Sequence, residues 1–163
     1  MRLFLAQSAT LYDYGTLQAR FSAALTGRWR PESSLHATVL FLGQRFAQEE
    51  VIAAVSAAVP PLEGADVIGV ERFGHNRIFY GAAAHPSLCR AHADLSRRFG
   101  MTPHPVYTPH VTLMRYKRLD ETAYETARQQ IEGVILGRIE GPLLLMRSTL
   151  TPQGAVYDVL HQF

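Results

Sequence analysis

The feature that most constrains the fold of this chain is an order of elements, strand, helix, strand, helix, that occurs twice. The first copy lies around residues 1 to 60 and the second around residues 77 to 132. The first copy opens with a predicted strand, Arg2 to Gln7, and a predicted helix, Leu11 to Leu25, which we expect Gly27 to end. Because the two copies predict two similar lobes that share one core, we expect the whole chain, residues 1–163, to form a single domain of two intertwined lobes.

The remaining elements follow from hydrophobic periodicity and from the turn residues between them. We expect further strands at Leu35–Leu42, Ala65–Phe73, Arg77–Ala83, Val111–Arg115, Ile135–Met146 and Ala155–Leu160, and further helices at Gln48–Val59, Pro86–Phe99 and Thr122–Ile131. Residues 74–76 read as a hairpin turn, which makes the strands on either side antiparallel. The fold class is therefore α+β, a bilobal pseudo-two-fold fold with antiparallel-rich sheets and with helices on the outside.

Composition limits the class of protein. Hydrophobic residues make up 47% of the 163 residues and charged residues 18%, which is enough apolar material for a core and argues against disorder. Cys89 is the only cysteine, so no internal disulfide and no cysteine-based zinc site can form. No apolar run is long enough to span a membrane. We expect a soluble, cytoplasmic monomer, and we infer no protein partner.

Arginine dominates the basic residues. Of the 16 basic residues all but Lys117 are arginine, and a guanidinium can hold phosphate or carboxylate through two parallel hydrogen bonds. Arginine-rich codon usage with solvated side chains would give the same bias. The net charge is only +2, so a local anion site is better supported than a surface that coats nucleic acid.

Two related tetrapeptides, His-x-Thr followed by an apolar residue, occupy corresponding strands of the two copies. Side chains alternate along a strand, so each histidine shares a face with the threonine two residues later. If a pseudo-two-fold relates the two lobes, the two strands line a central cleft and their four polar side chains converge there. These side chains are His36, Thr38, His110 and Thr112.

Two imidazoles are suited to acid–base chemistry at neutral pH. With ordinary pKa values near 6.5, one can take a proton from water while the other gives one to a leaving group. Hydroxyl and guanidinium groups can bind phosphate oxygens without a metal ion. Phosphodiester cleavage fits this set of groups, and the alternative is a pair of structural histidines beside hydrogen-bonded threonines.

The segments Leu35–Gly43 and Tyr107–Arg115 resemble the paired signatures of the 2H phosphoesterase superfamily. Within it the chain is most similar to the LigT-like bacterial RNA 2′,3′-cyclic phosphodiesterases, also called the 2′-5′ RNA ligase family. The similarity extends from the opening Arg2–Ala6 to the tail Leu150–Gly154, so it covers nearly the whole chain. Ala37 departs from the branched apolar residue that is common in the family, which leaves substrate preference open.

The resemblance implies a reaction and a set of roles. A 2′,3′-cyclic phosphate at an RNA end would open to a 2′-phosphomonoester, and the reverse sense would join RNA ends by a 2′-5′ linkage. His36 would donate a proton to the departing 3′ oxygen, and His110 would accept one from water. Thr38 and Thr112 would bind the non-bridging oxygens. Which histidine is the acid and which the base stays open, because the roles exchange in the reverse reaction.

Several further residues are candidates for substrate contact. Arg115 matches a family arginine, although strict alternation puts it on the face opposite His110 unless the strand bulges. Tyr107, Phe41 and Tyr80 are placed to stack on a nucleobase, with core packing the preferred interpretation for Phe41.

Lys117 and Arg118 follow the second motif. They are placed either to meet an RNA backbone or to be solvated turn residues.

The sequence indicates neither a metal ion nor a cofactor. His104 and His110 do not have the spacing of a zinc site, and no phosphate-binding glycine loop occurs. The partner classes are therefore RNA 3′ ends or small nucleotide cyclic phosphates such as ADP-ribose 1″,2″-cyclic phosphate, with no membrane. A non-catalytic module that binds RNA ends is the alternative from another class.

Overall fold

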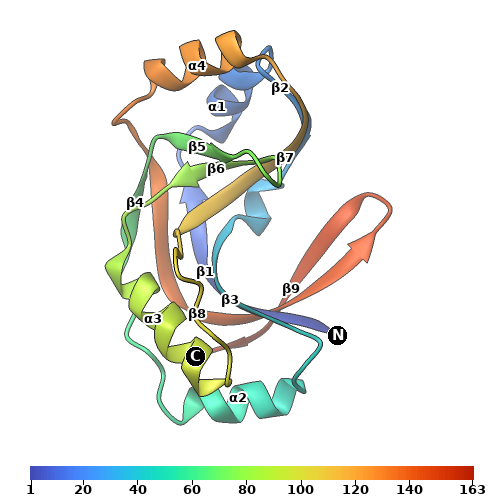
Figure 1. The fold of residues 1–163 in the computed structure, drawn as a ribbon, viewed down its shortest axis with the longest axis vertical. Coiled ribbons are helices and arrows are strands. Elements are labelled where there is room, and N and C mark those ends of the chain that lie inside the picture. The colour runs from blue at the N-terminus through green and yellow to red at the C-terminus, as the bar shows by residue number, and fades with distance from the viewer.

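The computed structural model describes residues 1–163 as one antiparallel sheet of nine strands with four helices (Figure 1). The strands are β1 (Arg2–Leu11), β2 (Leu25–Trp29), β3 (His36–Gly43), β4 (Ala65–Ile68), β5 (Val70–Phe73), β6 (Ile78–Ala82), β7 (His110–Leu119), β8 (Ile135–Thr151) and β9 (Gly154–Gln162). The helices are α1 (Tyr14–Phe21), α2 (Gln48–Ser56), α3 (Pro86–Arg98) and α4 (Glu121–Gln130), with a 3-10 turn at Glu32–Ser34. The α+β class is confirmed.

The two motif strands, β3 and β7, have corresponding neighbours in the sheet. The main path runs β4-β8-β1-β3-β7-β6-β5, so β1 takes the place beside β3 that β6 takes beside β7. Strand β2 is an additional partner of β7, and β9 is an additional partner of β8. Helices α1 and α4 lie together at one end of the molecule and α2 and α3 at the other (Figure 1). The sheet is one continuous unit, where the sequence had led us to expect more than one.

Helix α3 shows how local sequence fixes an element. Its residues Leu88, Ala91 and Leu95 recur every three or four positions and are all buried. His85 occupies the N-cap, where its side chain accepts a hydrogen bond from the Leu88 amide. The helix ends at the residue before Phe99, as the sequence had indicated to within one position.

The segment that follows α1 differs from the expectation. We expected one helix from Leu11 to Leu25, but β1 continues to Leu11, α1 covers only Tyr14–Phe21, and β2 begins at Leu25. Gly27 does not end a helix. It lies inside β2, where a Cβ atom would come within 2.7 Å of the Arg115 carbonyl oxygen, so the close approach of β7 requires glycine.

The strand expected at Ala65–Phe73 is divided in two. Gly69 adopts a φ of 68°, which side chains disfavour, and it separates β4 from β5. Strand β4 pairs with β8 whereas β5 pairs with β6, so the break carries the chain from one edge of the sheet to the other. The hairpin around residues 74–76 is confirmed as antiparallel.

The core lies between the sheet and the helices. Its largest fully buried side chains include Phe21 of α1 and Phe79 of β6, whose ring centroids are 4.8 Å apart. Trp29 of β2 packs against Phe79 at 5.8 Å, so β2 contributes to this core although it lies off the main path of the sheet. None of the helices is long and apolar enough to cross a membrane.

Candidate active site

The two motif strands have a single backbone partner pair. Ala37 of β3 lies opposite Val111 of β7, the one partner pair between these strands, and both side chains are fully buried in the core. Side chains alternate along a strand, so the residues before and after this pair point to the other face. In antiparallel register each histidine then lies opposite the threonine of the other strand. The four residues on that face are His36, Thr38, His110 and Thr112.

A hollow of about 190 Å³ opens on this face. It is lined by Arg30, Ser34, His36, Thr38, Ile78, Thr112, Arg115 and Tyr157. His110 is not among the residues that line the hollow. His36, Thr38 and Thr112 therefore line one hollow, while the convergence of all four motif side chains on a catalytic site stays a prediction.

The two imidazoles are oriented in the same way. His36 Nδ1 lies 2.8 Å from the Ser34 carbonyl oxygen, and His110 Nδ1 lies 2.7 Å from the Thr108 carbonyl oxygen. A carbonyl oxygen only accepts, so each Nδ1 must carry the proton and donate it. In the neutral ring Nε2 is therefore the basic atom, and it is the atom of each histidine that can exchange protons with a substrate.

The environment of His36 includes two aromatic rings and a guanidinium. Its ring centroid lies 5.1 Å from that of Phe4 on β1 and 5.0 Å from that of Tyr157 on β9. The Arg30 Cζ atom lies 5.3 Å from the Tyr157 ring centroid, in the range of a cation–π contact. Burial lowers the pKa of His36 below its ordinary value of 6.5, and the Arg30 charge lowers it further.

The environment of His110 is similar. Phe73 of β5 and Tyr80 of β6 lie 5.1 Å and 5.2 Å from its ring centroid, and these two rings stack on each other at 4.3 Å. Burial lowers the pKa of His110, against the opposing effect of its hydrogen bond to Thr108. We had considered Tyr80 as a residue that could stack on a nucleobase. In the structure its side chain is buried and packs against His110.

A bulge in β7 decides where Arg115 points. Strand β6 pairs with Thr112 and then with Met114, so Leu113 is an extra residue in β7. The extra residue shifts the alternation by one position and returns Arg115 to the face of Thr112, where it lines the hollow. The sequence had left this outcome conditional on a bulge.

Strand β3 has the corresponding bulge. Strand β1 pairs with Thr38 and then with Leu40, which leaves Val39 as the extra residue and puts Phe41 on the face of Thr38. Phe41 is 46% exposed, and the Arg2 Cζ atom lies 5.4 Å from its ring centroid. Our preferred interpretation of Phe41 as a core residue is therefore wrong, while its contact with a nucleobase stays a prediction.

Tyr107 forms a bridge between the two motifs. Its hydroxyl donates to the Thr38 carbonyl oxygen at 2.7 Å, and its ring stacks on His92 with 4.1 Å between centroids and 6° between planes. His92 Nδ1 donates to the Val39 carbonyl oxygen at 2.7 Å, and its Nε2 accepts from the His104 amide at 3.1 Å. The hydroxyl and one ring face of Tyr107 are thus engaged within the protein.

Two contributors to the site lay beyond sequence reasoning. Phe4 and Tyr157 flank His36 but belong to β1 and β9, at opposite ends of the chain. No local pattern brings them together, because their contact depends on the pairing of β8 with both β1 and β9. No group of three or more His, Cys, Asp or Glu side chains is arranged to hold a metal ion.

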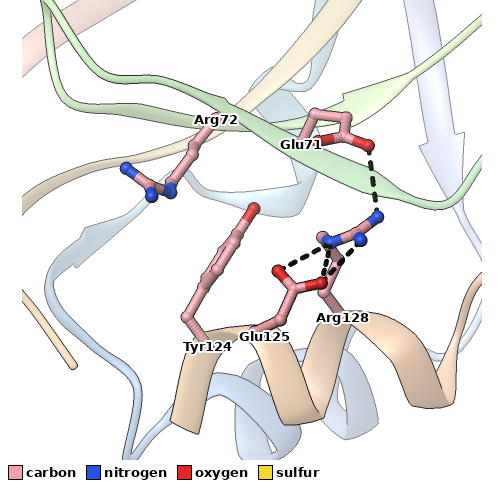
Figure 2. A pocket seen from close by; sticks show the side chains of 5 residues that line it. All are labelled: Glu71, Arg72, Tyr124, Glu125 and Arg128. Atoms are coloured by element: carbon pink, nitrogen blue, oxygen red, sulfur yellow. Dashed lines mark hydrogen bonds and ion pairs between the residues drawn. The ribbon is translucent and has the colours of Figure 1, made fainter. Parts of the chain in front are cut away.

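A second, larger hollow of about 460 Å³ lies between β5 and α4 (Figure 2). Its charges are largely paired with one another: Arg128 contacts Glu125 at 2.7 Å and Glu71 at 3.4 Å, and Arg72 pairs with Glu121. These arginines are already neutralised within the protein, so this hollow is less suited to a phosphate than the cleft beside the histidines.

Several solved structures have the same fold as this chain. TT0787 of Thermus thermophilus is 24% identical, with a TM-score of 0.61 over 100% of this chain and 97% of that chain. E. coli LigT complexed with ATP is 19% identical, with a TM-score of 0.68 over 99% of this chain and 96% of that one. E. coli LigT complexed with 3′-AMP is 17% identical, with the same TM-score and coverage. At this identity the similarity establishes the fold.

The sequence comparison establishes the family. The comparison with curated proteins found no match. The sequence pattern of the 2′-5′ RNA ligase superfamily, however, matches residues 13–137, which include both His-x-Thr strands and most of the chain. The chain therefore belongs to the 2′-5′ RNA ligase superfamily, the LigT-like 2H phosphoesterases.

Proposed function

We propose that this protein hydrolyses the 2′,3′-cyclic phosphate at an RNA end to a 2′-phosphomonoester, without a metal ion and by acid–base catalysis between two histidines. The observation that carries the proposal is the matched orientation of His36 and His110. Each Nδ1–H is held by a backbone carbonyl, which leaves each Nε2 free to exchange protons, and His36 lines the same hollow as Thr38, Thr112 and Arg115. Family membership supports the phosphoesterase class.

In the proposed reaction His110 Nε2 takes a proton from water as the water oxygen attacks phosphorus. The bond between phosphorus and the 3′ oxygen breaks, and His36 Nε2 gives its proton to that oxygen. One water is consumed, and the products are a 2′-phosphomonoester and a free 3′ hydroxyl. If the 5′ hydroxyl of a second RNA attacks phosphorus in place of water, His110 takes the proton of that hydroxyl, the bond to the 3′ oxygen breaks as before, and the two RNA ends are joined by a 2′-5′ linkage.

The charge on the phosphate must be balanced while the new bond forms. Thr38 and Thr112 have hydroxyls on the face of the two imidazoles, and we assign them to the non-bridging oxygens. Arg115 lines the same hollow and makes no ion pair within the protein, so its charge is available to the phosphate. Phe41 is exposed on the same face of β3, and we assign it to the terminal nucleobase.

The test is to incubate the purified protein, in excess EDTA, with a short RNA that ends in a 2′,3′-cyclic phosphate. We expect a 2′-phosphate to accumulate, identified by enzymatic digestion and mass. A 3′-phosphate would mean that the other bond breaks and would reverse the proposed geometry. If the RNA binds but is not cleaved, the protein is a non-catalytic module that binds RNA ends. If it neither binds nor is cleaved, small cyclic nucleotides become the substrate class to examine.

A further inference from the structure

Two arginines of like charge face each other across β2 and β7. Arg28 of β2 is the direct partner of Arg115 of β7, and both side chains are exposed. Like charges in directly opposed positions destabilise a sheet unless a counter-charge lies nearby. The ion pairs of the protein involve five other arginines, and neither Arg28 nor Arg115 has a carboxylate partner. This pair is therefore suited to bind an anion.

The arginine pair is continuous with the cleft. Trp29 lies between Arg28 and Arg30 in sequence and packs into the core opposite Met114, so the two arginines point to the other face. Arg30 and Arg115 both line the hollow beside the histidines. Arg28 is not among the lining residues, so it extends the positive charge beyond the position of the reacting phosphate.

The β8–β9 hairpin forms the opposite side of this extension. Figure 1 shows the outer part of the hairpin standing away from the rest of the sheet. A Cβ atom on Gly154, at the turn, would lie 3.9 Å from Arg28 Nη1, and Arg30 Nη1 lies 3.5 Å from the Ala155 carbonyl oxygen. Tyr157, further along β9, lies against His36. Strand β2 and the hairpin thus flank a path that leads from His36 to Arg28.

We propose that Arg28 binds a second phosphate of the substrate, the phosphodiester that joins the terminal nucleotide to the one before it, while Arg115, its direct partner across the strands, lies between this phosphate and the reacting one. This inference rests on the proposed function and narrows its substrate class to oligonucleotides, in preference to nucleoside cyclic monophosphates. A guanidinium can hold two oxygens of a phosphodiester through charge-assisted hydrogen bonds, and such contacts position a nucleic acid without reading its sequence.

The experiment compares kcat/KM for adenosine 2′,3′-cyclic phosphate with kcat/KM for a dinucleotide that ends in the same group. The native protein should prefer the dinucleotide by roughly tenfold or more, the effect of one charge-assisted contact. Arg28→Ala should remove most of this preference by lowering kcat/KM for the dinucleotide, while kcat/KM for the mononucleotide stays unchanged. Arg28→Lys should retain part of the preference. Arg90→Ala is the matched control, because Arg90 is exposed on α3 and makes no ion pair.

Two further substrates identify the source of the second phosphate. A dinucleotide with a neutral methylphosphonate linkage should behave like the mononucleotide. An adenosine 2′,3′-cyclic phosphate with a 5′-diphosphate should have a kcat/KM that exceeds that of the mononucleotide by less than the dinucleotide's does. An equal increase in kcat/KM would overturn the restriction to RNA. Equal kcat/KM for mononucleotide and dinucleotide in the native protein would overturn the second site altogether. So would an equal loss on both substrates in Arg28→Ala, which would point to a general effect on the fold.

A binding measurement separates this inference from the proposed reaction. If the native protein cleaves neither substrate, the proposed function fails, and calorimetry with a dinucleotide that ends in a 2′-phosphate then tests the second site alone. Tighter binding of the dinucleotide than of adenosine 2′-phosphate, lost in Arg28→Ala, would support the site without the reaction. Equal binding of both would overturn it.

Discussion

Ala37 and Val111 form the one backbone partner pair between the two motif strands, and both side chains are fully buried. Beyond this pair the strands diverge, and each continues with a bulge three residues after its histidine. The single contact fixes the relative position of the two imidazoles, while the divergence leaves room for the hollow that Thr38 and Thr112 line. The catalytic geometry that we propose therefore depends on this one pair and on contacts beyond it, such as the hydrogen bond from the Tyr107 hydroxyl to the Thr38 carbonyl oxygen.

Replacement of either histidine by alanine should lower kcat/KM by roughly 10² to 10⁴, because each removes one partner in proton transfer. Both rings are half-buried at the edge of the cleft, so far-ultraviolet circular dichroism should be unchanged for His36→Ala and His110→Ala. His75→Ala is the matched control, since His75 is exposed in the β5–β6 turn. Near-native turnover in either active-site variant would rule out the two-histidine mechanism.

Sequence reasoning succeeded where the signal is local. The alternation of side chains placed the histidine and threonine of each motif on one face, and the repeated order of elements placed the two strands side by side. It failed at β2, because Leu25 continues the helical spacing of α1 and only the distant partner β7 makes the segment Leu25–Trp29 a strand. Propensity is a weak guide where tertiary pairing decides.

The bulges and the aromatic contacts illustrate the same limit. A bulge depends on the register of the neighbouring strand, so the sequence could state only that Arg115 needed one to face the cleft. Phe41 is apolar and was therefore assigned to the core, but the bulge at Val39 turns it outward. Tyr157 reaches His36 because β9 folds back along β8, and nothing near Tyr157 in sequence indicates that contact.

Tyr107→Phe should lower both stability and turnover. It removes only the hydroxyl that donates to the Thr38 carbonyl oxygen, a hydrogen bond worth about 1 kcal/mol, and leaves the stack on His92 in place. Because this bond ties the loop before His110 to the first motif strand, we expect kcat to fall more than KM changes. Urea denaturation and steady-state kinetics measure the two effects, with Tyr12→Phe as control because Tyr12 is 56% exposed. A loss of stability with unchanged kcat would show that the bridge does not position the site.

The pH dependence of kcat/KM should be bell-shaped with its maximum below pH 6.5. Burial lowers the pKa of both His36 and His110 from the ordinary value of 6.5. The reaction needs one ring protonated and the other neutral, and with both pKa values lowered this state is most populated on the acid side of 6.5. Initial rates at low substrate concentration between pH 4.5 and about 8.5 measure the profile. A maximum above pH 7 would contradict the assignment of the two limbs to these rings.

His85→Asn should destabilise the protein at pH 8 more than at pH 5. His85 Nε2 donates to the Gln7 side chain at 2.9 Å, and Nδ1 accepts from the Leu88 amide at 3.3 Å, so the buried ring must be neutral. Asparagine can still cap α3 but leaves the buried Gln7 oxygen without its donor, at a cost of about 1–3 kcal/mol.

The sign of the pH effect follows from the pKa of His85. Burial lowers that pKa below the ordinary 6.5, with nearby Glu63 opposing and Arg138 adding to the effect. As pH falls through 6.5, His85 takes up a proton in the unfolded chain but not in the folded protein, so the unfolding free energy of the native protein decreases. The variant lacks His85, so its unfolding free energy does not decrease for this reason. Urea denaturation of both proteins at the two pH values measures the gap in unfolding free energy. If the gap is the same at pH 5 and pH 8, His85 does not contribute to the acid sensitivity of the fold.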